Sequence, residues 1–291
     1  MFGAMSDEKP RWLMVRPPSG SAYERMRSAL NEGGVRTVCS SSQCPNKGEC
    51  WSRGHAAFML LGDRCTRRCG FCAVNGGVPG DPDPREPESV ADAIERLGIA
   101  HCVLTSVTRD DLPDRGAGHL AATVDAIRRR SPSTVIELLI PDMDGLPGPI
   151  STVVWSGPDI VGHNLETVRR LQPVARDPRA GYDISLATLA RIKDAEPRII
   201  SKSSLMLGMG ETMDEVREAM KDLREVGVDI LSIGQYLRPK GGRVPVSRYV
   251  TPDEFKELEE EAYHMGFRKV ASGPLVRSSY RAWEVCVGAD G

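Results

Sequence analysis

The sequence predicts an α/β protein, a partial (β/α)6 barrel of the TIM type preceded by an N-terminal extension. Two observations predict this class. From about residue 57, short apolar runs alternate with segments of helical periodicity, the pattern of βαβ units around a parallel sheet. Six of the eight cysteines fall between Cys39 and Cys72, before the alternation and in its first loop. We therefore divide the chain into an extension, residues 1–56, and a barrel, residues 57–291.

Six apolar runs are expected to form the strands of the barrel. They cover residues 58–61, 102–105, 135–140, 159–161, 199–207 and 230–233. Helical spacing predicts helices at 88–97, 120–130, 165–171 and 184–195, the last with Asp183 as its N-cap. Two later helices have strong start signals, at Thr212 with Glu215 and at Thr251 with Glu254. Residues 22–30 fit a short helix in the extension, and residues 269–271 a short extended piece. Six strands are fewer than the eight of a closed barrel, which favours an open one.

The composition argues against several functional classes. The 38 Lys and Arg residues nearly balance the 40 Asp and Glu residues, giving a formal net charge of −2. A protein that grips nucleic acid through its whole surface is usually basic, so this balance argues against such a role. No apolar run approaches the roughly 18 residues of a membrane helix, and the N-terminus lacks the apolar core of a signal peptide. We expect a cytoplasmic protein.

The first cysteine trio follows the first predicted strand. Cys65, Cys69 and Cys72 have the spacing C-x3-C-x2-C, and the βα loops of such barrels carry the chemistry. Three thiolates on one short loop can bind three irons of a [4Fe–4S] cluster and leave the fourth iron open. A zinc site or a redox C-x2-C pair are the alternatives. We expect the adjacent Arg64, Arg67 and Arg68 to lower the thiol pKa values and offset the charge of the cluster.

The second trio lies in the extension. Cys39, Cys44 and Cys50 have the spacing C-x4-C-x5-C, again with no obvious fourth cysteine. By spacing alone the trio fits an iron–sulfur cluster and a zinc site equally well. Pro45 and Gly48 supply turns that let three ligands converge.

Together these motifs resemble a known family. The loop trio is the signature of radical S-adenosylmethionine enzymes, and the upstream trio is similar to the auxiliary-cluster motif of the lipoyl synthases. Further stretches match the pattern of that family: residues 107–114 (VTRDDLPD), 137–142 (ELLIPD), 163–168 (HNLETV), 205–212 (LMLGMGET), 235–239 (QYLRP) and 273–280 (GPLVRSSY). The resemblance covers residues 36–281. One departure is Arg115, where the family usually has glycine, so a positive φ there would require a reshaped loop.

The resemblance implies both cofactors and reaction. Cys65, Cys69 and Cys72 would hold the catalytic [4Fe–4S] cluster, with S-adenosylmethionine on its open iron. The extension trio would hold a second [4Fe–4S] cluster, with Ser279 as the fourth ligand. The implied chemistry is insertion of two sulfur atoms at C6 and C8 of an octanoyl chain on a carrier lysine. A 5′-deoxyadenosyl radical removes the hydrogens and the auxiliary cluster supplies the sulfur. No catalytic residue is expected beyond the cluster ligands.

Other polar and aromatic residues at strand ends are candidate contacts to S-adenosylmethionine. They are Phe71, Thr105, Glu137, Asn164, Lys202 and Arg238. For each of them the alternative is a structural role, either in packing or in a local hydrogen bond or ion pair. We assign Cys102 to the core, and we give Cys286 no role.

The resemblance also implies partners. The substrate would be an octanoylated lipoyl carrier domain or a glycine-cleavage H-type protein, with a reductant such as ferredoxin or flavodoxin, and the enzyme a monomer without nucleic-acid or membrane partners. Lys240 and Arg243 form a basic loop that could dock an acidic carrier or could simply be solvated. The alternatives are another sulfur-inserting radical enzyme, acting on RNA or a metabolite, and a non-catalytic iron–sulfur or zinc scaffold.

Overall fold

One open parallel sheet forms the centre of the molecule. The computed structural model describes residues 9–15 and 17–280. Its strands follow the order of the chain: β1 (Ala57–Leu60), β4 (His101–Ser106), β5 (Val135–Leu139), β6 (Ile160–Gly162), β7 (Ile200–Leu207), β8 (Ile230–Gln235) and β9 (Lys269–Gly273). The six predicted strands are confirmed. The short extended piece pairs with β8 as a seventh strand, so the sheet is one strand wider than expected.

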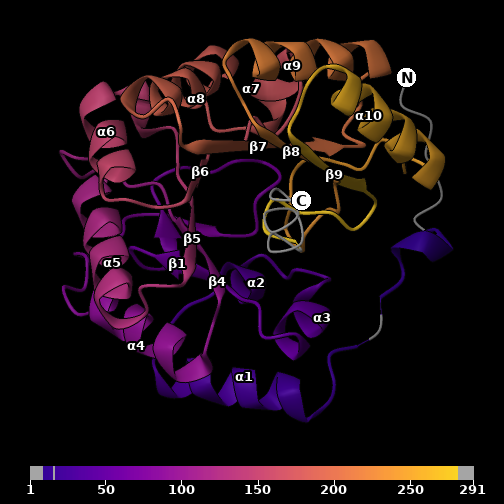
Figure 1. The fold of residues 1–291 in the computed structure, drawn as a ribbon. Helices are drawn as coiled ribbons and strands as arrows, with labels where there is room; N and C mark the ends of the chain where they lie inside the picture. Colours follow the sequence, from indigo (N-terminus) through magenta and orange to yellow (C-terminus); the bar gives the residue numbers. More distant parts are fainter. Residues whose placement is uncertain (1–8, 16, 281–291) are drawn as a thin grey trace.

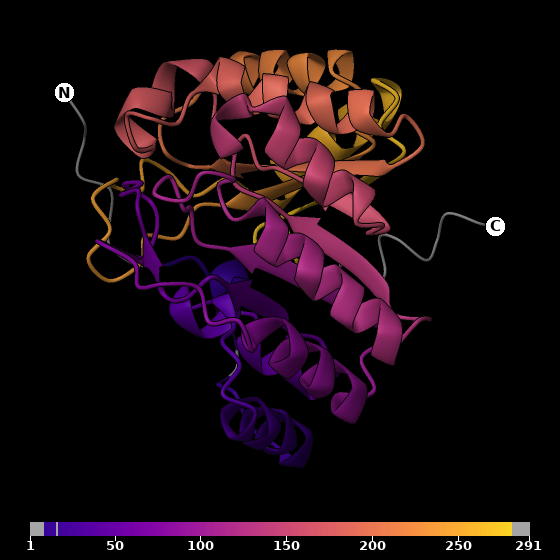
Figure 2. The same ribbon diagram turned by 90° about the vertical axis from the view of Figure 1, so that its left-hand side faces the viewer.

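The larger helices form an arc along the outer side of the sheet (Figure 1). They are α4 (Glu86–Leu97), α5 (Ala117–Arg130), α6 (Pro147–Trp155), α8 (Tyr182–Ala195), α9 (Met213–Glu225) and α10 (Pro252–His264). A quarter turn shows them side by side, from the indigo extension at one end to the orange helices at the other (Figure 2). The described part of the chain contains no helix with the length and apolar character needed to span a bilayer.

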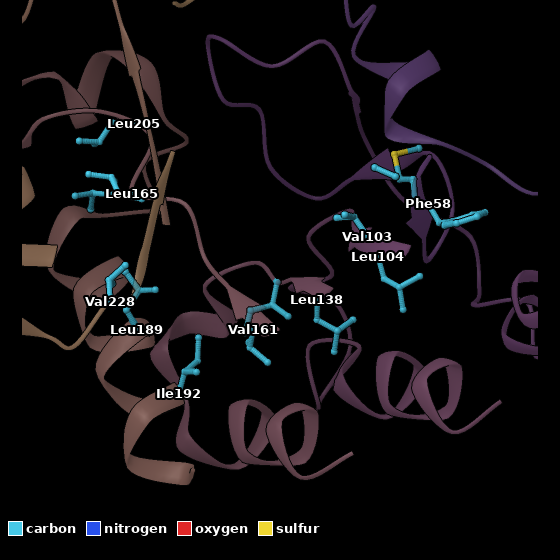
Figure 3. Close-up of a cluster of buried hydrophobic side chains, with 14 of the residues drawn as sticks. Phe58, Val103, Leu104, Leu138, Val161, Leu165, Leu189, Ile192, Leu205 and Val228 are labelled. Carbon is cyan, nitrogen blue, oxygen red and sulfur yellow. The ribbon is translucent and has the colours of Figure 1, made fainter. Parts of the chain in front are cut away.

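The core lies between the sheet and this helical layer. Leu104, Leu138 and Val161, on three neighbouring strands, are completely buried, as are Leu189 and Ile192 of α8. Figure 3 shows the strand side chains directed toward the helices. Burying each such side chain contributes about 1.5–3 kcal/mol. This packing fixes the strands, and therefore also the loops at their carboxyl ends.

The two predicted capping boxes are confirmed, whereas the predicted N-cap of α8 is wrong. Thr212 and Thr251 each form a capping box with the glutamate three residues later. Asp183 is not an N-cap: α8 follows Gly181, and the Asp183 carboxylate pairs with Arg169 at 2.8 Å.

The helix predicted over residues 165–171 does not form. The backbone of Glu166 bonds to β7 through Ser204 and Met206, at 3.0 and 2.8 Å, and Glu166 has a left-handed φ of 71°. This bridge to β7 and the left-handed φ of Glu166 prevent a helix here, and only a 3-10 turn (Arg169–Leu171) and the short α7 (Gln172–Ala175) follow.

The N-terminal extension packs against the edge of the sheet. It contains a 3-10 turn (Arg11–Leu13), α1 (Ser21–Glu32), α2 (Val38–Ser41) and α3 (Lys47–Ser52), and α1 confirms the helix predicted at residues 22–30. Tyr23 of α1 stacks on Trp51 of α3 with ring centroids 5.3 Å apart. The Arg36 carbonyl accepts a hydrogen bond from Met59 N at 2.9 Å. This bond to β1 sets the extension trio beside the first strand.

Candidate active site at the carboxyl ends of the strands

The whole loop trio and two cysteines of the extension trio face one cavity of about 480 Å³. The ends of β4, β5, β7 and β8 line it, together with Cys39, Cys44, Cys65, Cys69, Cys72 and Ser279. A smaller recess shares Cys39, Cys44 and Ser279 with this cavity and adds Cys50. The fold therefore gathers seven residues from three distant parts of the sequence. Cys102 is completely buried in β4 and belongs to neither lining, while Cys286 lies outside the described residues.

The loop trio is framed by a small two-stranded sheet. Strands β2 (Arg64–Cys65) and β3 (Asn75–Gly76) pair at the two ends of the loop. Each sulfur accepts a backbone N–H: Cys65 Sγ from Thr108 at 3.3 Å, Cys69 Sγ from Asp177 at 3.4 Å, and Cys72 Sγ from Val74 at 3.4 Å. Such donors stabilise thiolates and tune iron–sulfur clusters.

The arginines beside the loop trio do not have the predicted effect. Burial raises the pKa of Cys69, and raises the pKa of Cys72 to about 11. Among the cations, it is Arg176 that opposes the rise at Cys69. The pKa of these two thiols is therefore raised, not lowered as expected, and Arg64, Arg67 and Arg68 are not among the main causes that act on it. The sequence could not show that desolvation outweighs charge here.

Arg67 instead ties the loop trio to neighbouring βα loops. Its guanidinium pairs with Asp110 at 2.8 Å, Asp142 at 2.5 Å and Asp144 at 2.9 Å. The side chain is only 3% exposed, so these carboxylates neutralise its charge inside the protein. Although burial opposes ionisation, the hydrogen bond from Arg67 holds the pKa of Asp142 below its usual range.

Arg115 stands at the position where the family usually has glycine. Its φ is 57°, so the left-handed backbone is retained without glycine. The side chain bonds to Asp144 at 2.7 Å and to the carbonyls of Leu112 and Asp110 at 2.7 and 3.2 Å. The residue thus adopts a left-handed φ without glycine, and these side-chain bonds offset the backbone strain.

The extension trio lies next to the C-terminal segment. Cys39 is in α2, Cys50 is in α3, and Cys44 lies between these helices. Burial raises the pKa of Cys39, and raises the pKa of Cys50 to about 12. Tyr280 donates a hydrogen bond to the Glu49 carboxylate at 3.2 Å, which joins the segment carrying Ser279 to α3.

Four of the six candidate cofactor contacts lie in the cavity lining: Phe71, Thr105, Asn164 and Arg238. Glu137 and Lys202 are absent from it. They form a buried ion pair in the barrel interior, with Lys202 Nζ 2.7 Å from Glu137 Oε1 and both side chains 3% exposed or less. Their charges neutralise each other, which is the structural alternative for these two residues.

Among the charged residues of the lining to which sequence reasoning gave no role are Glu166 and Arg176. Glu166 follows Asn164 within the HNLETV stretch, and Asn164 donates to its carboxylate at 3.2 Å. Burial raises the pKa of Glu166. Arg176 follows α7 in a loop without periodicity, so no local pattern distinguishes it.

The donor set fits iron–sulfur clusters and an organic cofactor. All six cysteines are free thiols. Among residues 9–15 and 17–280, no three His, Cys, Asp or Glu side chains converge on a point suited to a single metal ion. Ligands of a cubane cluster bind different irons and need no such point. Asn164 Oδ1 and Arg176 Nε are buried without partners among the described residues, as expected if a polar ligand enters the cavity.

Solved structures share the fold. The FeFe-hydrogenase maturase HydG from Carboxydothermus hydrogenoformans aligns with a TM-score of 0.59 at 13% identity, over 86% of this chain and 57% of that protein. Methylornithine synthase (PylB) aligns with a TM-score of 0.56 at 11% identity, over 85% of this chain and 74% of that protein. At such identities the likeness concerns the fold alone, and it confirms the predicted partial barrel.

Sequence relatives are much closer. The family model of the radical SAM superfamily matches residues 59–235. The lipoyl synthase of Thermus thermophilus is 52% identical over 97% of this chain and 87% of that protein. Lipoyl synthase of Deinococcus radiodurans is 51% identical, over 98% and 86% respectively, and the chloroplastic enzyme of Ricinus communis is 49% identical, over 96% and 79%. The chain therefore belongs to the lipoyl synthase family of the radical SAM superfamily.

Proposed function

We propose that this enzyme works in the cytoplasm and inserts two sulfur atoms, at C6 and C8, into an octanoyl chain carried on a protein lysine. The observation that supports this most is the shared cavity. A radical-generating site and a sulfur-donating site must both reach one carbon chain. The loop trio shares its cavity with Cys39, Cys44 and Ser279, and Cys50 lines the recess that adjoins these three residues. The family places the chain among sulfur-inserting enzymes.

In this proposal each trio holds one [4Fe–4S] cluster. Cys65, Cys69 and Cys72 leave one iron open for S-adenosylmethionine, whereas Ser279 completes the set of Cys39, Cys44 and Cys50. When bound, these groups supply the electron, the carbon-centred radical and the sulfur. An alkoxide ligand from Ser279 is harder than a thiolate, which suits a cluster that is consumed.

The protein itself positions the cofactor and the substrate and shields them from water. Phe71, Thr105, Asn164 and Arg238 are proposed to contact S-adenosylmethionine, since they line the cavity beside the loop trio. Thr105 also donates to the Leu139 carbonyl at 3.0 Å, which fixes its rotamer. The strand ends surround the reacting carbons and limit the access of water, which protects a reactive intermediate.

The proposed partners are an octanoylated lipoyl carrier domain or H-type protein and a reductant such as ferredoxin or flavodoxin. The loop with Lys240 and Arg243 lies beside the cluster loop: Arg243 N donates to the Gly70 carbonyl at 2.8 Å. A carrier docked there would reach the cavity. Charge reversal of Lys240 and Arg243 should raise the Michaelis constant for the carrier; an unchanged constant would remove this docking site from the proposal.

The test uses the reconstituted protein with dithionite, S-adenosylmethionine and an octanoylated lysyl peptide. Mass spectrometry should show a lipoyl-lysyl product, and analysis should give about eight irons and eight sulfides per chain, as two cubane clusters require. Deoxyadenosine without sulfur insertion would favour a different substrate. Zinc without iron would favour the scaffold alternative and reject the enzyme.

The ligand role of Ser279 has its own test. Ser279→Ala should spare the cleavage of S-adenosylmethionine and lower sulfur insertion, since only the extension trio loses a ligand. Ser156→Ala is the control, because Ser156 lies outside the cavity lining and its hydroxyl donates to the Val153 carbonyl at 2.7 Å. Equal loss of both activities in Ser279→Ala would count against the assignment.

A further inference from the structure

Arg176 is held at a defined place beside the loop trio. The Ala175 carbonyl accepts a hydrogen bond from Gly70 N at 2.7 Å, and Asp177 N donates to Cys69 Sγ at 3.4 Å. The Asp177 carboxylate also accepts from Arg68 N at 2.9 Å. The residues on both sides of Arg176 are therefore bonded to the cluster loop. Its backbone cannot move independently of Cys69.

The Arg176 side chain is bonded on one edge only. Its Nη1 donates to Ser185 Oγ at 2.7 Å, whereas its Nε is buried and has no partner among the described residues. Arg176 also lines the cavity, so the side chain that Ser185 holds borders the ligand space. The bond to Ser185 is the contact that decides where this charge points.

Ser185 is in turn bonded to a histidine. Ser185, in the first turn of α8, is completely buried, and His163, directly after β6, is 2% exposed. Ser185 Oγ lies 2.9 Å from His163 Nε2, and His163 Nδ1 lies 2.9 Å from the Ile140 carbonyl. The chain of bonds thus runs from the end of β5, through β6 and α8, to Arg176.

The direction of each bond in this chain is determined. A carbonyl oxygen can only accept, so His163 Nδ1 must carry a proton. Burial lowers the pKa of His163 to about 4, so the ring is neutral near pH 7 and Nε2 is an acceptor. Ser185 must therefore donate its hydroxyl proton to Nε2. Its lone pairs are left to accept from Arg176.

We propose that Ser185 and His163 are positioning residues that orient the Arg176 guanidinium toward the anionic group bound beside Cys69. The inference rests on the proposed function, because it assumes that S-adenosylmethionine and the loop cluster occupy this cavity. Neither Ser185 nor a ring nitrogen of His163 needs to touch the ligand. Their effect is to hold a positive charge at the cavity through a neutral hydroxyl partner, although the buried Glu166 side chain lines the same cavity and interacts with Arg176.

The test compares Ser185→Ala with Thr123→Val in the reconstituted enzyme. Thr123 is an equally buried helical hydroxyl that bonds only to the His119 carbonyl at 2.9 Å. Loss of a hydrogen bond to a charged group should weaken S-adenosylmethionine binding about tenfold in Ser185→Ala, with kcat for deoxyadenosine changed less than KM. Thr123→Val should bind as the parent does. In an Arg176→Met background, Ser185→Ala should have no further effect.

Unchanged binding in Ser185→Ala, or an effect fully additive with Arg176→Met, would overturn the proposal. A second measurement uses the parent protein and therefore does not depend on whether a variant folds. In the cluster-free parent, ¹⁵N spectra at pH 7 should show a neutral His163 protonated on Nδ1; an Nε2–H tautomer or an imidazolium would also overturn it. Failure of the parent to bind S-adenosylmethionine would instead reject the proposed function.

Discussion

Asn46 donates its side-chain amide to the Leu275 carbonyl at 2.6 Å, across 229 positions of sequence. Asn46 belongs to the loop between Cys44 and Cys50, and Leu275 lies four residues before Ser279. Asn46 is 3% exposed, so the bond is protected from water. A Cβ atom at Gly234 would collide with the Val276 carbonyl, so glycine allows the segment to approach β8 this closely. The Asn46 bond joins the segment that carries Ser279 to the extension, and the close approach at Gly234 joins the same segment to β8.

Asn46→Ala should therefore loosen the extension site selectively. Leaving the Leu275 carbonyl without its donor costs about 1–3 kcal/mol. We expect reconstituted iron to fall from about eight toward about four per chain, while deoxyadenosine formation persists. Asn31→Ala, on the exposed face of α1, is the control. Full iron content in Asn46→Ala would show that the C-terminal segment is held by other contacts.

Arg67→Met should destabilise the protein by about 3–5 kcal/mol, because it leaves the buried Asp142 charge without its partner. Urea unfolding at pH 7 measures this. Adding Asp142→Asn should recover part of the loss, since the amide carries no charge. Arg85→Met, at an exposed pair with Asp83, serves as the control and should be close to neutral. A single Arg67→Met with parental stability would contradict the role of Arg67 as the tie between loops.

Arg115→Gly sets two effects against each other. Glycine relieves the left-handed strain, worth roughly 1 kcal/mol, but removes three side-chain bonds, one of them to the Asp144 carboxylate. Since a hydrogen bond to a charged group contributes about 1.5–3 kcal/mol and the side chain is partly exposed, we expect a net loss of about 1 kcal/mol. Calorimetry or urea unfolding measures it. A variant more stable than the parent would mean that the strain dominates.

The free energy of unfolding should depend on pH through His163. Burial is the main cause that lowers its pKa to about 4, and the nearby Arg176 and Arg67 act in the same direction while Asp142 opposes them. The unfolded chain binds the proton near pH 6.5. Stability is therefore complete above pH 6.5 and falls between pH 6.5 and 4, by roughly 3 kcal/mol.

His163→Gln should flatten this part of the pH profile. The difference between parent and variant isolates the contribution of His163, because His101, whose pKa burial also lowers, titrates in both proteins. The measurement is urea unfolding at closely spaced pH values. Parallel profiles for the two proteins would show that His163 is not the group that titrates.

The sequence predicts most of the strands because their signals are local. Uninterrupted apolar runs and the two capping boxes need no tertiary information, and they are confirmed. The helix expected at residues 165–171 is wrong because β7 captures the backbone of Glu166, a long-range contact. Asp183 likewise binds Arg169 rather than its own helix. The helix α6 is not expected from the sequence, because it begins with Pro, Gly and Pro, residues that usually mark turns.

The site residues likewise divide into those that the local sequence predicts and those that only the folded protein brings together. The spacing of the loop trio is local and predicts a shared loop. That Glu137 and Lys202 pair with each other, 65 positions apart, depends on the register of the barrel. The same holds for Arg176, whose place in the cavity is set by contacts to Cys69 and Ser185. Desolvation, which raises the thiol pKa values against the arginines, is also a property of the folded protein alone.

In the proposed function, two trios with different tasks serve one cavity and the recess that adjoins it. Deoxyadenosine and lipoyl-lysyl product should be measured in the same reaction for Cys50→Ala and Cys69→Ala. We predict that Cys50→Ala forms deoxyadenosine without lipoyl product, because only the sulfur-donating site is damaged, and that Cys69→Ala forms neither. Lipoyl product from Cys50→Ala, or deoxyadenosine from Cys69→Ala, would contradict this division of labour.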